Sequence, residues 1–517
     1  MIDLLGIAVA FVVAASFAFF STPYIARLAV KLGAIDHPDG RRKCQAEPVP
    51  RGGGVAVMLA ACLGIVTVVL FSTPATGGSS DLLWRGLLPA AGILLVVGVV
   101  DDVLTLTGIY KLIGQMLAVS VLVAGGTQFD QVSLFGVLIP LGGLRLPFTI
   151  FFCLGAINAF NLIDGVDALA SSIGAVACVA LGIITGSRGD VAAALICFAM
   201  AGALIGFLRH NVAPARVYLG DTGSMLIGLV VAAVAIDCSI KQQAAFVLAV
   251  PMAVCAIPIL DAAAALVRRI TTGQSVFTPD RGHLHHALLL RGWSVNKTVL
   301  IITALAGLTC GGALVSYFTG NDLFALAIVG GVCGMLALAR VFGHVEAALI
   351  ASHSLSLTKS ILSRSALRRA PETESAFQLQ GSRKWHKLWV ALREAAPVYN
   401  LSGMTLQIGM PHLHESFYAN WKSNEPAAAS NPWRVTLPLK LDNQPVGKLT
   451  VIGSTDGAEA LTDLRQIIEF LEPLHGQISE LIEGGKRAAD RERVVAPASA
   501  FHIERTGALD AVPGLLN

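Results

Sequence analysis

The sequence predicts an all-α polytopic membrane protein with about 11 transmembrane helices, followed by a small cytoplasmic α+β tail. The first observation is composition: 54% of the 517 residues are hydrophobic and only 14% are charged, whereas soluble proteins carry about 25% charged residues. The second is uneven charge: residues 1–340 carry 19 Lys or Arg and 16 Asp or Glu, and the remaining 177 residues carry 18 of each. The third is the recurrence of long apolar stretches in the first region.

These stretches approach the length of about 17–25 residues that a membrane-spanning helix needs. The eleven predicted spans lie near residues 3–22, 52–71, 85–100, 111–125, 147–160, 167–185, 190–208, 223–237, 243–267, 299–317 and 323–339. We expect the first to remain as a helix and not to be cleaved as a signal peptide, because its arginines follow the apolar run.

Basic residues predict the orientation, because cytoplasmic loops carry an excess of Lys and Arg. Fifteen such residues flank alternate connections and four lie on the other side. The fifteen are Arg27, Lys31, Arg41, Arg42, Lys43, Arg51, Lys111, Arg209, Arg216, Arg268, Arg269, Arg281, Arg291, Lys297 and Arg340, and the four are Arg85, Arg145, Arg188 and Lys241. The N-terminus is therefore expected outside and the C-terminus in the cytoplasm, which agrees with an odd number of spans.

Three regions are expected along the chain: a membrane domain at 1–340, a linker at 341–384 and a cytoplasmic α+β module at 385–517. Within the module, Trp433–Leu441 and Val446–Gly453 alternate as strands do, whereas Leu461–Ile482 has helical spacing. Within the membrane domain, Val132 to Leu146 suggests a hairpin. All nine cysteines lie in the first region without a CxxC pair, which favours packing roles over disulfides or zinc.

Acidic side chains gather at predicted cytoplasmic helix ends, not at the bilayer centre, where a carboxylate costs roughly 2.5–3.5 kcal/mol. Asp101 and Asp102 close the third span, and the sequence returns to the membrane at Lys111. Taken alone, two adjacent aspartates are equally consistent with the solvation of a helix end.

A second cluster lies in the segment NAFNLIDGVDALA. Asn158, Asn161, Asp164 and Asp167 step by three residues, so a helix here would carry four oxygen-bearing side chains on one face. Amide and carboxylate oxygens suit Mg²⁺, which shares its coordination shell with water and substrate phosphates. In the segment RVYLGDTGS, Asp221 either caps the eighth span or lies open to a metal and phosphate ligand between two glycines.

The segment TPDRGHLHHALLLRGW gathers cations in the longest predicted cytoplasmic loop. Its candidates are Arg281, His283, His285 and His286. Zinc binding is disfavoured because no cysteine lies nearby and the histidines are crowded; histidines at a membrane surface are a second alternative. Binding of a diphosphate is preferred, because guanidinium groups donate to phosphate oxygens in pairs. Arg42, Lys43 and Arg51 of the first loop either serve the same ligand or only set the topology.

Together these five clusters predict phosphoryl transfer between a soluble nucleotide and a lipid at the inner membrane surface. In their order along the chain, the five clusters resemble those of the polyprenyl-phosphate N-acetylhexosamine-1-phosphate transferases of glycosyltransferase family 4. The resemblance covers about residues 20–300. The resemblance implies Mg²⁺-dependent transfer of a sugar 1-phosphate from a UDP-sugar to undecaprenyl phosphate, with release of UMP, as the first membrane step of cell-envelope polysaccharide synthesis. It also implies a bacterial inner-membrane protein whose active site faces the cytoplasm.

The resemblance assigns roles by position. The catalytic residues implied are Asp101, Asp102, Asp164 and Asp167, and the metal ligands implied are Asn161 and Asp221. The substrate-binding residues implied are Lys111, Asn158, Arg281, His283, His285, His286, Arg42, Lys43 and Arg51. The HLHH form favours UDP-N-acetylglucosamine as donor. Mn²⁺ is an alternative metal, a homodimer is left open, and nucleic acid is not expected as a partner.

Two positions depart from the family pattern. Gln45 stands two residues after Lys43, where a histidine is common, and Ala168 stands where glycine is usual. Three other functions remain as alternatives: a phospho-MurNAc-pentapeptide translocase, a catalytically silent scaffold, and an anionic-solute transporter. A transporter would place its binding residues in broken helices at the membrane midplane, and the sequence shows no such pattern.

Overall fold

The computed structural model describes residues 2–37, 48–71, 81–134, 137–240, 249–272, 274, 282–351, 354, 373–380, 384–397, 401–410, 415–423, 432–441 and 444–454. The predicted features that lie outside these residues include the helix expected at Leu461–Ile482 and the basic residues Arg41, Arg42, Lys43, Lys241 and Arg281. The chain divides into two compact units, Met1–Leu362 and Ser363–Asn517, and each is described by itself.

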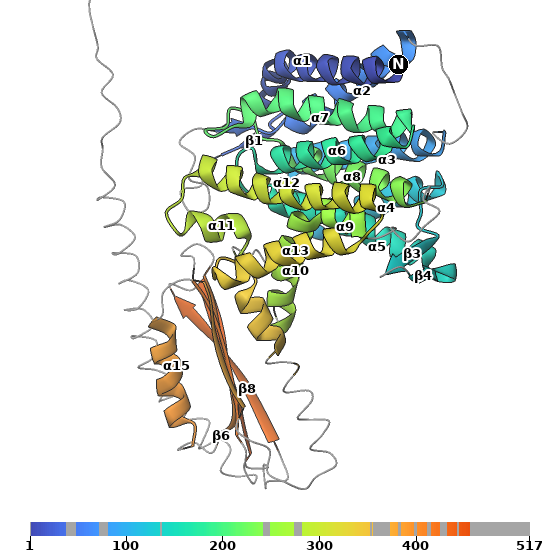
Figure 1. Cartoon of the computed structure of the whole chain (residues 1–517). Coiled ribbons are helices and arrows are strands. Elements are labelled where there is room, and N and C mark those ends of the chain that lie inside the picture. Colours follow the sequence, from blue (N-terminus) through green and yellow to red (C-terminus); the bar gives the residue numbers. More distant parts are fainter. Residues whose placement is uncertain are drawn as a thin grey trace, which may run out of the picture. The chain divides into compact units, whose positions relative to one another are not determined.

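The first unit is a bundle of helices (Figure 1). The helices are α1 (Ile2–Lys31), α2 (Gly53–Phe71), α3 (Asp81–Leu104), α4 (Gly108–Ala124), α5 (Arg145–Ile163), α6 (Leu169–Ser187), α7 (Val191–Asn211), α8 (Gly220–Ile240), α9 (Ala249–Val254), α10 (Ala256–Thr271), α11 (Leu284–Leu289), α12 (Val295–Thr319) and α13 (Leu323–Leu338). Among the described residues, eight helices are long and apolar enough to cross a membrane, and α4 and α13 are shorter apolar helices. The predicted polytopic helical fold is confirmed, whereas the count of eleven stays a prediction.

The predicted span at 243–267 differs from the structure. Its described part forms two helices, α9 and α10, separated at Cys255. Pro251 and Pro258 lie on either side of this break; each lacks a backbone N–H and crowds the preceding turn, which disfavours one continuous helix. The first span also differs, because α1 continues past Pro23 to Lys31.

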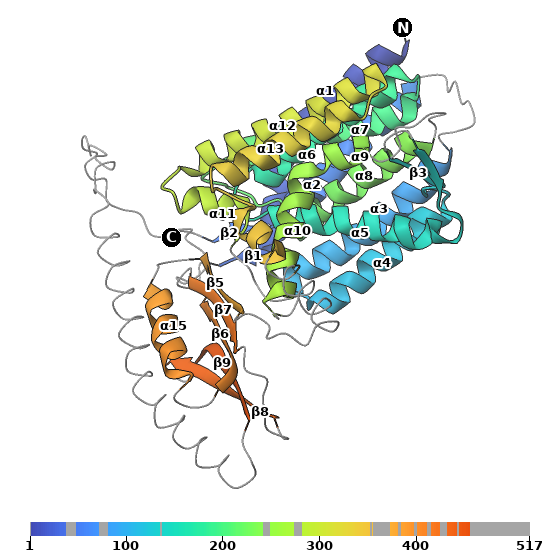
Figure 2. The ribbon, with the colours of Figure 1, turned by 60° about the horizontal axis from the view of Figure 1, so that its bottom comes forward.

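Helix α8 forms the centre of the bundle. In an 18-residue apolar stretch of α8, 94% of the residues are buried, against 17% in the corresponding stretch of α1. It packs against α2, α3, α5 and α6 (Figure 2). Glycines allow the closest of these contacts: a Cβ on Gly54 would overlap the backbone of Gly223, and a Cβ on Gly98 would overlap that of Thr222. The first turn of α8 therefore lies directly against α2 and α3.

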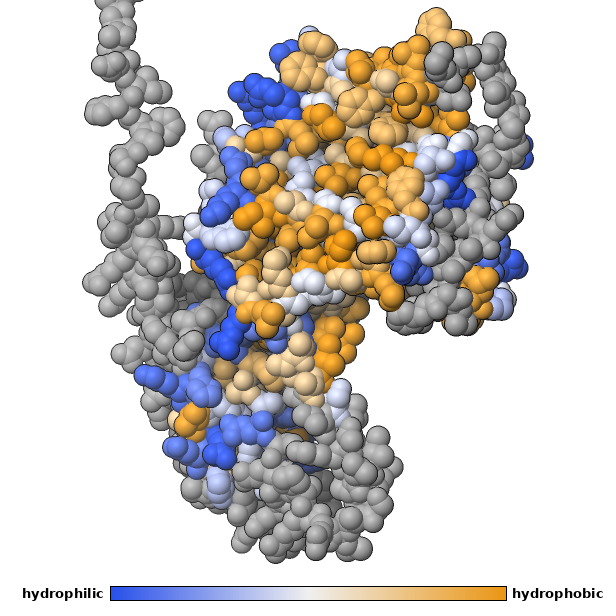
Figure 3. All heavy atoms as spheres, in the orientation of Figure 1, coloured by the Kyte–Doolittle hydropathy of each residue, from blue (hydrophilic) through white to orange (hydrophobic). Residues whose placement is uncertain are grey.

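Apolar side chains cover the visible face of the helical unit, and hydrophilic residues gather near the helix ends (Figure 3). Many of the exposed side chains on α1, α2 and α4 are large and apolar, including Leu70, Phe71 and Ile113. This surface suits contact with lipid and supports a multi-pass membrane protein. The predicted hairpin is present as β3 (Gln131–Leu134) paired antiparallel with β4 (Val137–Pro140), and β1 (Ile35–Asp36) pairs with β2 (Val49–Pro50) near the end of α1.

The second unit contains a five-stranded antiparallel sheet in the order β5-β7-β6-β9-β8. The strands are β5 (Thr373–Gln380), β6 (Leu401–Met410), β7 (Glu415–Lys422), β8 (Pro432–Leu441) and β9 (Gln444–Ser454). The last two lie where sequence alternation predicted strands. Helix α15 (Lys384–Ala395) packs against the sheet through Trp385 and Trp389, whose indole N–H groups donate to Glu415 at 2.8 Å and Glu374 at 2.9 Å.

Candidate active site

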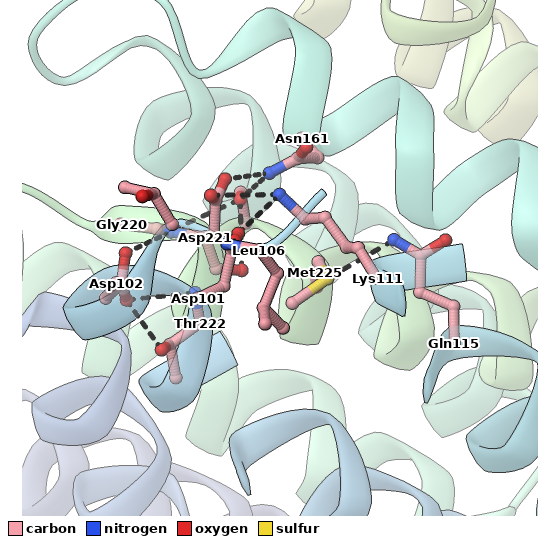
Figure 4. Close-up of polar contacts among 12 residues, drawn as sticks. Asp101, Asp102, Leu106, Lys111, Gln115, Asn161, Gly220, Asp221, Thr222 and Met225 are labelled. Carbon is pink, nitrogen blue, oxygen red and sulfur yellow. Dashed lines mark hydrogen bonds and ion pairs between the residues drawn. The ribbon is translucent and has the colours of Figure 1, made fainter. Parts of the chain in front are cut away.

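Polar side chains from four helices meet at one end of α8 (Figure 4). Lys111 of α4 lies between two carboxylates, with its Nζ 2.8 Å from Asp101 Oδ2 of α3 and 2.9 Å from Asp221 Oδ2 of α8. Asn161 of α5 donates from Nδ2 to Asp221 Oδ1 and, at 3.0 Å, to Ser224 Oγ. The structure thus brings together four predicted site residues that are separated by up to 120 positions.

Asp102 has a different environment from Asp101, although the two are adjacent in sequence. Its Oδ1 accepts the backbone N–H of Asp221 at 3.0 Å, and its Oδ2 accepts the backbone N–H and the hydroxyl of Thr222 at 3.3 and 2.7 Å. A Cβ on Gly220, whose φ is +74°, would lie 2.7 Å from Asp102 Oδ2. Both carboxylate oxygens are therefore bound to the first turn of α8, which Asp102 holds in place.

Asp101 faces Lys111 instead, because successive helix residues point about 100° apart. Its Oδ1 accepts the backbone N–H of Leu106 at 2.7 Å and its Oδ2 meets the Lys111 ammonium. The Leu106 bond closes the turn after α3, in which Thr105 has a φ of +50°. Only 4% of Asp101 is exposed, so its carboxylate is held rigidly beside the lysine.

The second predicted cluster is not continuously helical. Helix α5 ends at Ile163, Asp164 is its C-cap, and Ala168 has a left-handed φ of +66°. Asn158 and Asn161 lie on the helix as expected, but the expectation that Asp164 and Asp167 continue the same helical face is wrong. The left-handed backbone at Ala168 is a conformation that glycine adopts at no steric cost.

Asn211, at the end of α7, organises this turn and was not singled out from the sequence. Its Oδ1 accepts from the backbone N–H of Ala168 at 3.1 Å and from the Ser171 hydroxyl at 3.0 Å, and its Nδ2 donates to the Val217 carbonyl at 3.0 Å. Asp167 accepts the Ala215 N–H at 2.9 Å. The turn after α5 is thereby bound to the segment that leads into α8. In the sequence, the only feature that could have indicated this role is that Asn211 is a polar residue at the end of a long apolar run.

The turn is strongly acidic. Burial raises the pKa of Asp164 well above its usual value, the charges of Asp221, Asp102 and Asp167 raise it further, and Arg51 opposes them. Burial also raises the pKa of Asp167. Ionised carboxylates near one another repel, and this repulsion raises their pKa values. A bound cation offsets the repulsion, so such a cluster favours cation binding.

Arg51 joins the first loop to this site. Its guanidinium pairs with Asp36, and Arg51 forms a parallel bridge to Tyr218, three residues before Asp221. The Tyr218 N–H donates to the Pro50 carbonyl at 2.9 Å, and Gly53 donates to the Tyr218 carbonyl at 3.0 Å. Burial raises the pKa of the Tyr218 phenol to about 12, helped by Asp167 and Asp36.

The histidine segment begins at the N-terminus of α11. His283 Nδ1 lies 2.8 Å from Asp261 Oδ2, and the Leu284 N–H donates to Asp261 Oδ1 at 2.7 Å. Asp261, on α10, was not predicted as a site residue because one carboxylate on an amphipathic helix is ordinarily solvated. Farther along α10, Arg268 pairs with Glu346, and its guanidinium lies against Gly282.

His285 is buried beside the acidic turn. A Cβ on Gly165 would lie 2.7 Å from His285 Nε2, and neither ring nitrogen of His285 has a hydrogen-bond partner among the residues that the structure describes. Burial lowers its pKa to about 4, although the charge of Asp261 opposes this shift. The ring is therefore neutral near pH 7. The neighbouring ring of His286 lies 4.3 Å away, centroid to centroid, and is half-buried.

Among the described residues, the side-chain hydrogen bonds of Asn158 are to Gln115 and Leu154 and not to the Asp221 cluster. Its Nδ2 donates to Gln115 Oε1 and to the Leu154 carbonyl, both at 2.8 Å. The Gln115 amide, which is fully buried, also lies 3.3 Å from Met225 Sδ. This amide pair joins α4, α5 and α8 beneath the site, and Gln115 was missed because a single glutamine in an apolar run carries no motif.

The donor set near Asp221 fits a hard divalent cation. Within the described ranges no group of three His, Cys, Asp or Glu side chains has metal-holding geometry. Mg²⁺, however, is commonly held by one or two carboxylates together with water and substrate phosphates. Asp221 offers a carboxylate and Asn161 an amide, whose O and N are assigned only from hydrogen bonding and exchange places on a flip. These two side chains suit such an ion.

Comparison with known proteins agrees with this arrangement. The family model described as glycosyl transferase family 4 matches residues 84–239. A Mycobacterium tuberculosis (strain CDC 1551 / Oshkosh) protein named decaprenyl-phosphate N-acetylglucosaminephosphotransferase is 33% identical over 364 residues, covering 63% of this chain and 88% of the relative.

Two further relatives carry names for a similar reaction. A Bacillus subtilis (strain 168) protein named "Probable undecaprenyl-phosphate N-acetylglucosaminyl 1-phosphate transferase" is 31% identical over 301 residues, covering 58% of this chain and 82% of its own. A Salmonella typhi undecaprenyl-phosphate alpha-N-acetylglucosaminyl 1-phosphate transferase is 29% identical over 295 residues, covering 55% and 77%. The family-model match at residues 84–239 includes the positions of Asp101, Lys111, Asn161 and Asp221.

Proposed function

Because the chain belongs to glycosyl transferase family 4, the polyprenyl-phosphate N-acetylglucosamine-1-phosphate transferases, we propose that it transfers N-acetylglucosamine 1-phosphate from UDP-N-acetylglucosamine to undecaprenyl phosphate and releases UMP. The observation that carries the proposal is the junction of Asp101, Lys111, Asn161 and Asp221 at one end of the bundle. Such a junction can receive two anionic substrates only if cations offset their repulsion. The reaction would begin cell-envelope polysaccharide synthesis.

We propose that Asn161 and Asp221 hold Mg²⁺, with Mn²⁺ as a substitute. When bound, the ion would supply positive charge to the diphosphate oxygens. The contribution of the chain is to keep the two ligands in register: Asp102 fixes the backbone of Asp221, and Ser224 accepts a hydrogen bond from the Asn161 amide.

Lys111 and Asp101 have complementary roles in this proposal. The Lys111 ammonium donates to an acceptor phosphate oxygen, and Asp101 beside it takes the last proton of that phosphate, whose second pKa is about 6. The freed oxygen then forms a bond to the β-phosphorus of the donor, and the bond from that phosphorus to the UMP oxygen breaks. A two-step route through an aspartyl phosphate is the alternative, and isotope exchange between UMP and the donor without lipid would reveal it.

The orientation is proposed from charge. The excess of fifteen basic residues against four supports an orientation in which the active site, the C-terminus and the second unit lie on the cytoplasmic side of a bacterial inner membrane. Protease treatment of inside-out vesicles is expected to cleave the second unit, whereas treatment of the outer face of intact spheroplasts is expected to leave it whole. Cleavage from the outer face would contradict the orientation.

The reaction is tested with the purified full chain in lipid nanodiscs, supplied with UDP-N-acetylglucosamine, undecaprenyl phosphate and Mg²⁺ and monitored for UMP. We expect turnover that EDTA abolishes and that Asp221→Asn lowers by at least 100-fold. The control is Asp190→Asn, which changes the carboxylate that accepts from Ala193 N at 3.2 Å and caps α7 outside the site. Full turnover in EDTA would contradict the metal assignment, and turnover only with UDP-MurNAc-pentapeptide would favour the translocase alternative.

A further inference from the structure

The carboxylate of Asp261 is buried and has two partners at the start of the histidine segment. Only 1% of Asp261 is exposed. One oxygen accepts the Leu284 N–H at 2.7 Å and the other lies 2.8 Å from His283 Nδ1. A buried carboxylate needs such donors, since burying an unpaired charge is very unfavourable. Asp261 therefore fixes the first residue of α11 and the ring of His283 together.

These contacts determine which His283 nitrogen carries a proton. An ionised carboxylate only accepts hydrogen bonds, so Nδ1 must be protonated, and Nε2 is the nitrogen left for another partner. A carboxylate that holds the far nitrogen of an imidazole sets both its tautomer and its orientation, as in serine-protease and zinc sites.

The surrounding residues hold this segment beside the acidic turn. The rings of His283 and His285 are parallel within 1°, with centroids 5.7 Å apart, and His285 lies against Gly165, between Asp164 and Asp167. Two turns along α10 from Asp261, the guanidinium of Arg268 lies against Gly282, the residue before His283. The segment is thus anchored from α10 on one side and faces the turn after α5 on the other.

We propose that Asp261 is a positioning residue for the transfer: by holding Nδ1–H of His283, it presents Nε2 to the diphosphate of the sugar nucleotide. The inference rests on the proposed function. When the diphosphate binds, Nε2 takes up a proton from solvent, and the ring, now between two anionic groups, donates one hydrogen bond from Nδ1 to Asp261 and one from Nε2 to a phosphate oxygen. Charge-assisted hydrogen bonds of this kind are roughly twice as strong as neutral ones.

The test is Asp261→Asn in the full chain. The amide offers one acceptor and one donor, so if its oxygen keeps Leu284, its NH₂ faces His283 Nδ1 and moves the ring proton to Nε2. The neutral ring still donates from Nε2–H to the diphosphate but no longer carries the positive charge of an imidazolium, and we expect KM for the UDP-sugar to rise about tenfold while kcat stays within twofold. His283→Gln is expected to raise KM similarly, and the double variant no further, because Asp261 acts through His283.

A second readout does not depend on activity. In ¹⁵N-histidine-labelled protein, the difference between the spectra of wild type and His283→Gln isolates the two His283 nitrogens. We expect protonated Nδ1 in wild type and in the control Asp190→Asn, which makes the same chemical change at a carboxylate outside the site. We expect protonated Nε2 and bare Nδ1 in Asp261→Asn.

Three results would overturn the inference. A bare Nδ1 in wild type would do so even if Asp261→Asn failed to fold. Independent effects of Asp261→Asn and His283→Gln, multiplying in the double variant, would show that Asp261 does not act through His283. A fall in kcat with unchanged KM would place its role elsewhere. If the wild type released no UMP while its spectrum showed protonated Nδ1, the proposed function would fail and the contact would stand.

Discussion

Substituting Asp102 by asparagine is expected to destabilise the first turn of α8 more than it alters chemistry at the acceptor phosphate. In the structure both oxygens of Asp102 are occupied by the N–H groups of Asp221 and Thr222 and by the Thr222 hydroxyl, at 2.7 to 3.3 Å. An amide can accept on one side only, and its NH₂ then faces a donor. Either the Asp221 bond is lost, or the bond from the Thr222 N–H is lost and the Thr222 hydroxyl must turn to accept from the NH₂.

The size of the effect follows from these contacts. A hydrogen bond to a charged group contributes roughly 1.5–3 kcal/mol, and a negative charge at a helix N-terminus contributes roughly 0.3–1 kcal/mol. Losing one side of the carboxylate and its charge is expected to lower the free energy of unfolding by about 2–4 kcal/mol. Thr222→Val removes only the 2.7 Å hydroxyl bond to this carboxylate and serves as the graded control, with an expected loss of about 1.5–3 kcal/mol.

Two measurements check this expectation. SDS-induced unfolding of the full chain gives the change in stability, and a Mg²⁺ titration of UMP release gives the concentration for half-maximal rate. Because Asp102 holds the backbone of Asp221, we expect Asp102→Asn to raise that concentration by about tenfold or more and Thr222→Val to raise it less. Unchanged stability and unchanged Mg²⁺ dependence, together with lost turnover, would refute the reasoning and assign Asp102 directly to the substrate.

Three further changes test other parts of the structure. Ala168→Gly should raise the free energy of unfolding by about 0.5–1 kcal/mol, because it relieves a left-handed backbone that costs roughly 1–2 kcal/mol but adds chain entropy; a lower unfolding midpoint would contradict this. Asp164→Asn, compared with wild type in EDTA, should be more stable at pH 8, with the difference closing toward pH 4: the raised pKa means that ionised Asp164 destabilises the fold, and near pH 4 the carboxyl is protonated. A gap that does not change with pH would contradict the assignment. Glu346→Gln removes the buried ion pair between Glu346 and Arg268 and should destabilise the chain by roughly 1.5–3 kcal/mol, the contribution of a hydrogen bond to a charged group; no change in chemical denaturation would show that the pair is dispensable.

The sequence predicted best those elements that one local property decides. Apolar length predicted the long helices, alternation predicted β8 and β9, and the mixture of β-branched residues with Gly142 and Gly143 predicted the β3–β4 hairpin. It did not predict the division into α9 and α10, although Pro251 and Pro258 were visible in the run at 243–267. The prediction of one span rested on mean hydropathy, which is high throughout this run. Mean hydropathy does not account for the backbone N–H that each proline lacks.

At the site, the sequence predicted which residues come together better than what each does. Asp101 and Asp102 looked equivalent, and only the 100° rotation between successive helix residues directs one to Lys111 and the other to α8. The spacing of Asp164 and Asp167 suggested a helix that the left-handed Ala168 ends. Asp261 was not predicted as a site residue, because its contact with His283 joins residues 22 positions apart and leaves no local sequence pattern.

The position of Asp221 depends on several other elements. Gly54 of α2 donates to the Leu219 carbonyl at 2.8 Å, Asp102 of α3 accepts the Asp221 N–H, and Asn161 of α5 holds its carboxylate. Only the contact with Asn161 involves the side chain of Asp221. The other two are made by backbone groups of Leu219 and Asp221. A substitution that adds a Cβ at Gly54 would push α2 away from the backbone of α8 and so displace the proposed metal ligand without altering any charged group. Loss of activity in this protein is therefore expected at glycines on the apolar helices as well as at the acidic residues, because close backbone packing fixes where the carboxylate lies.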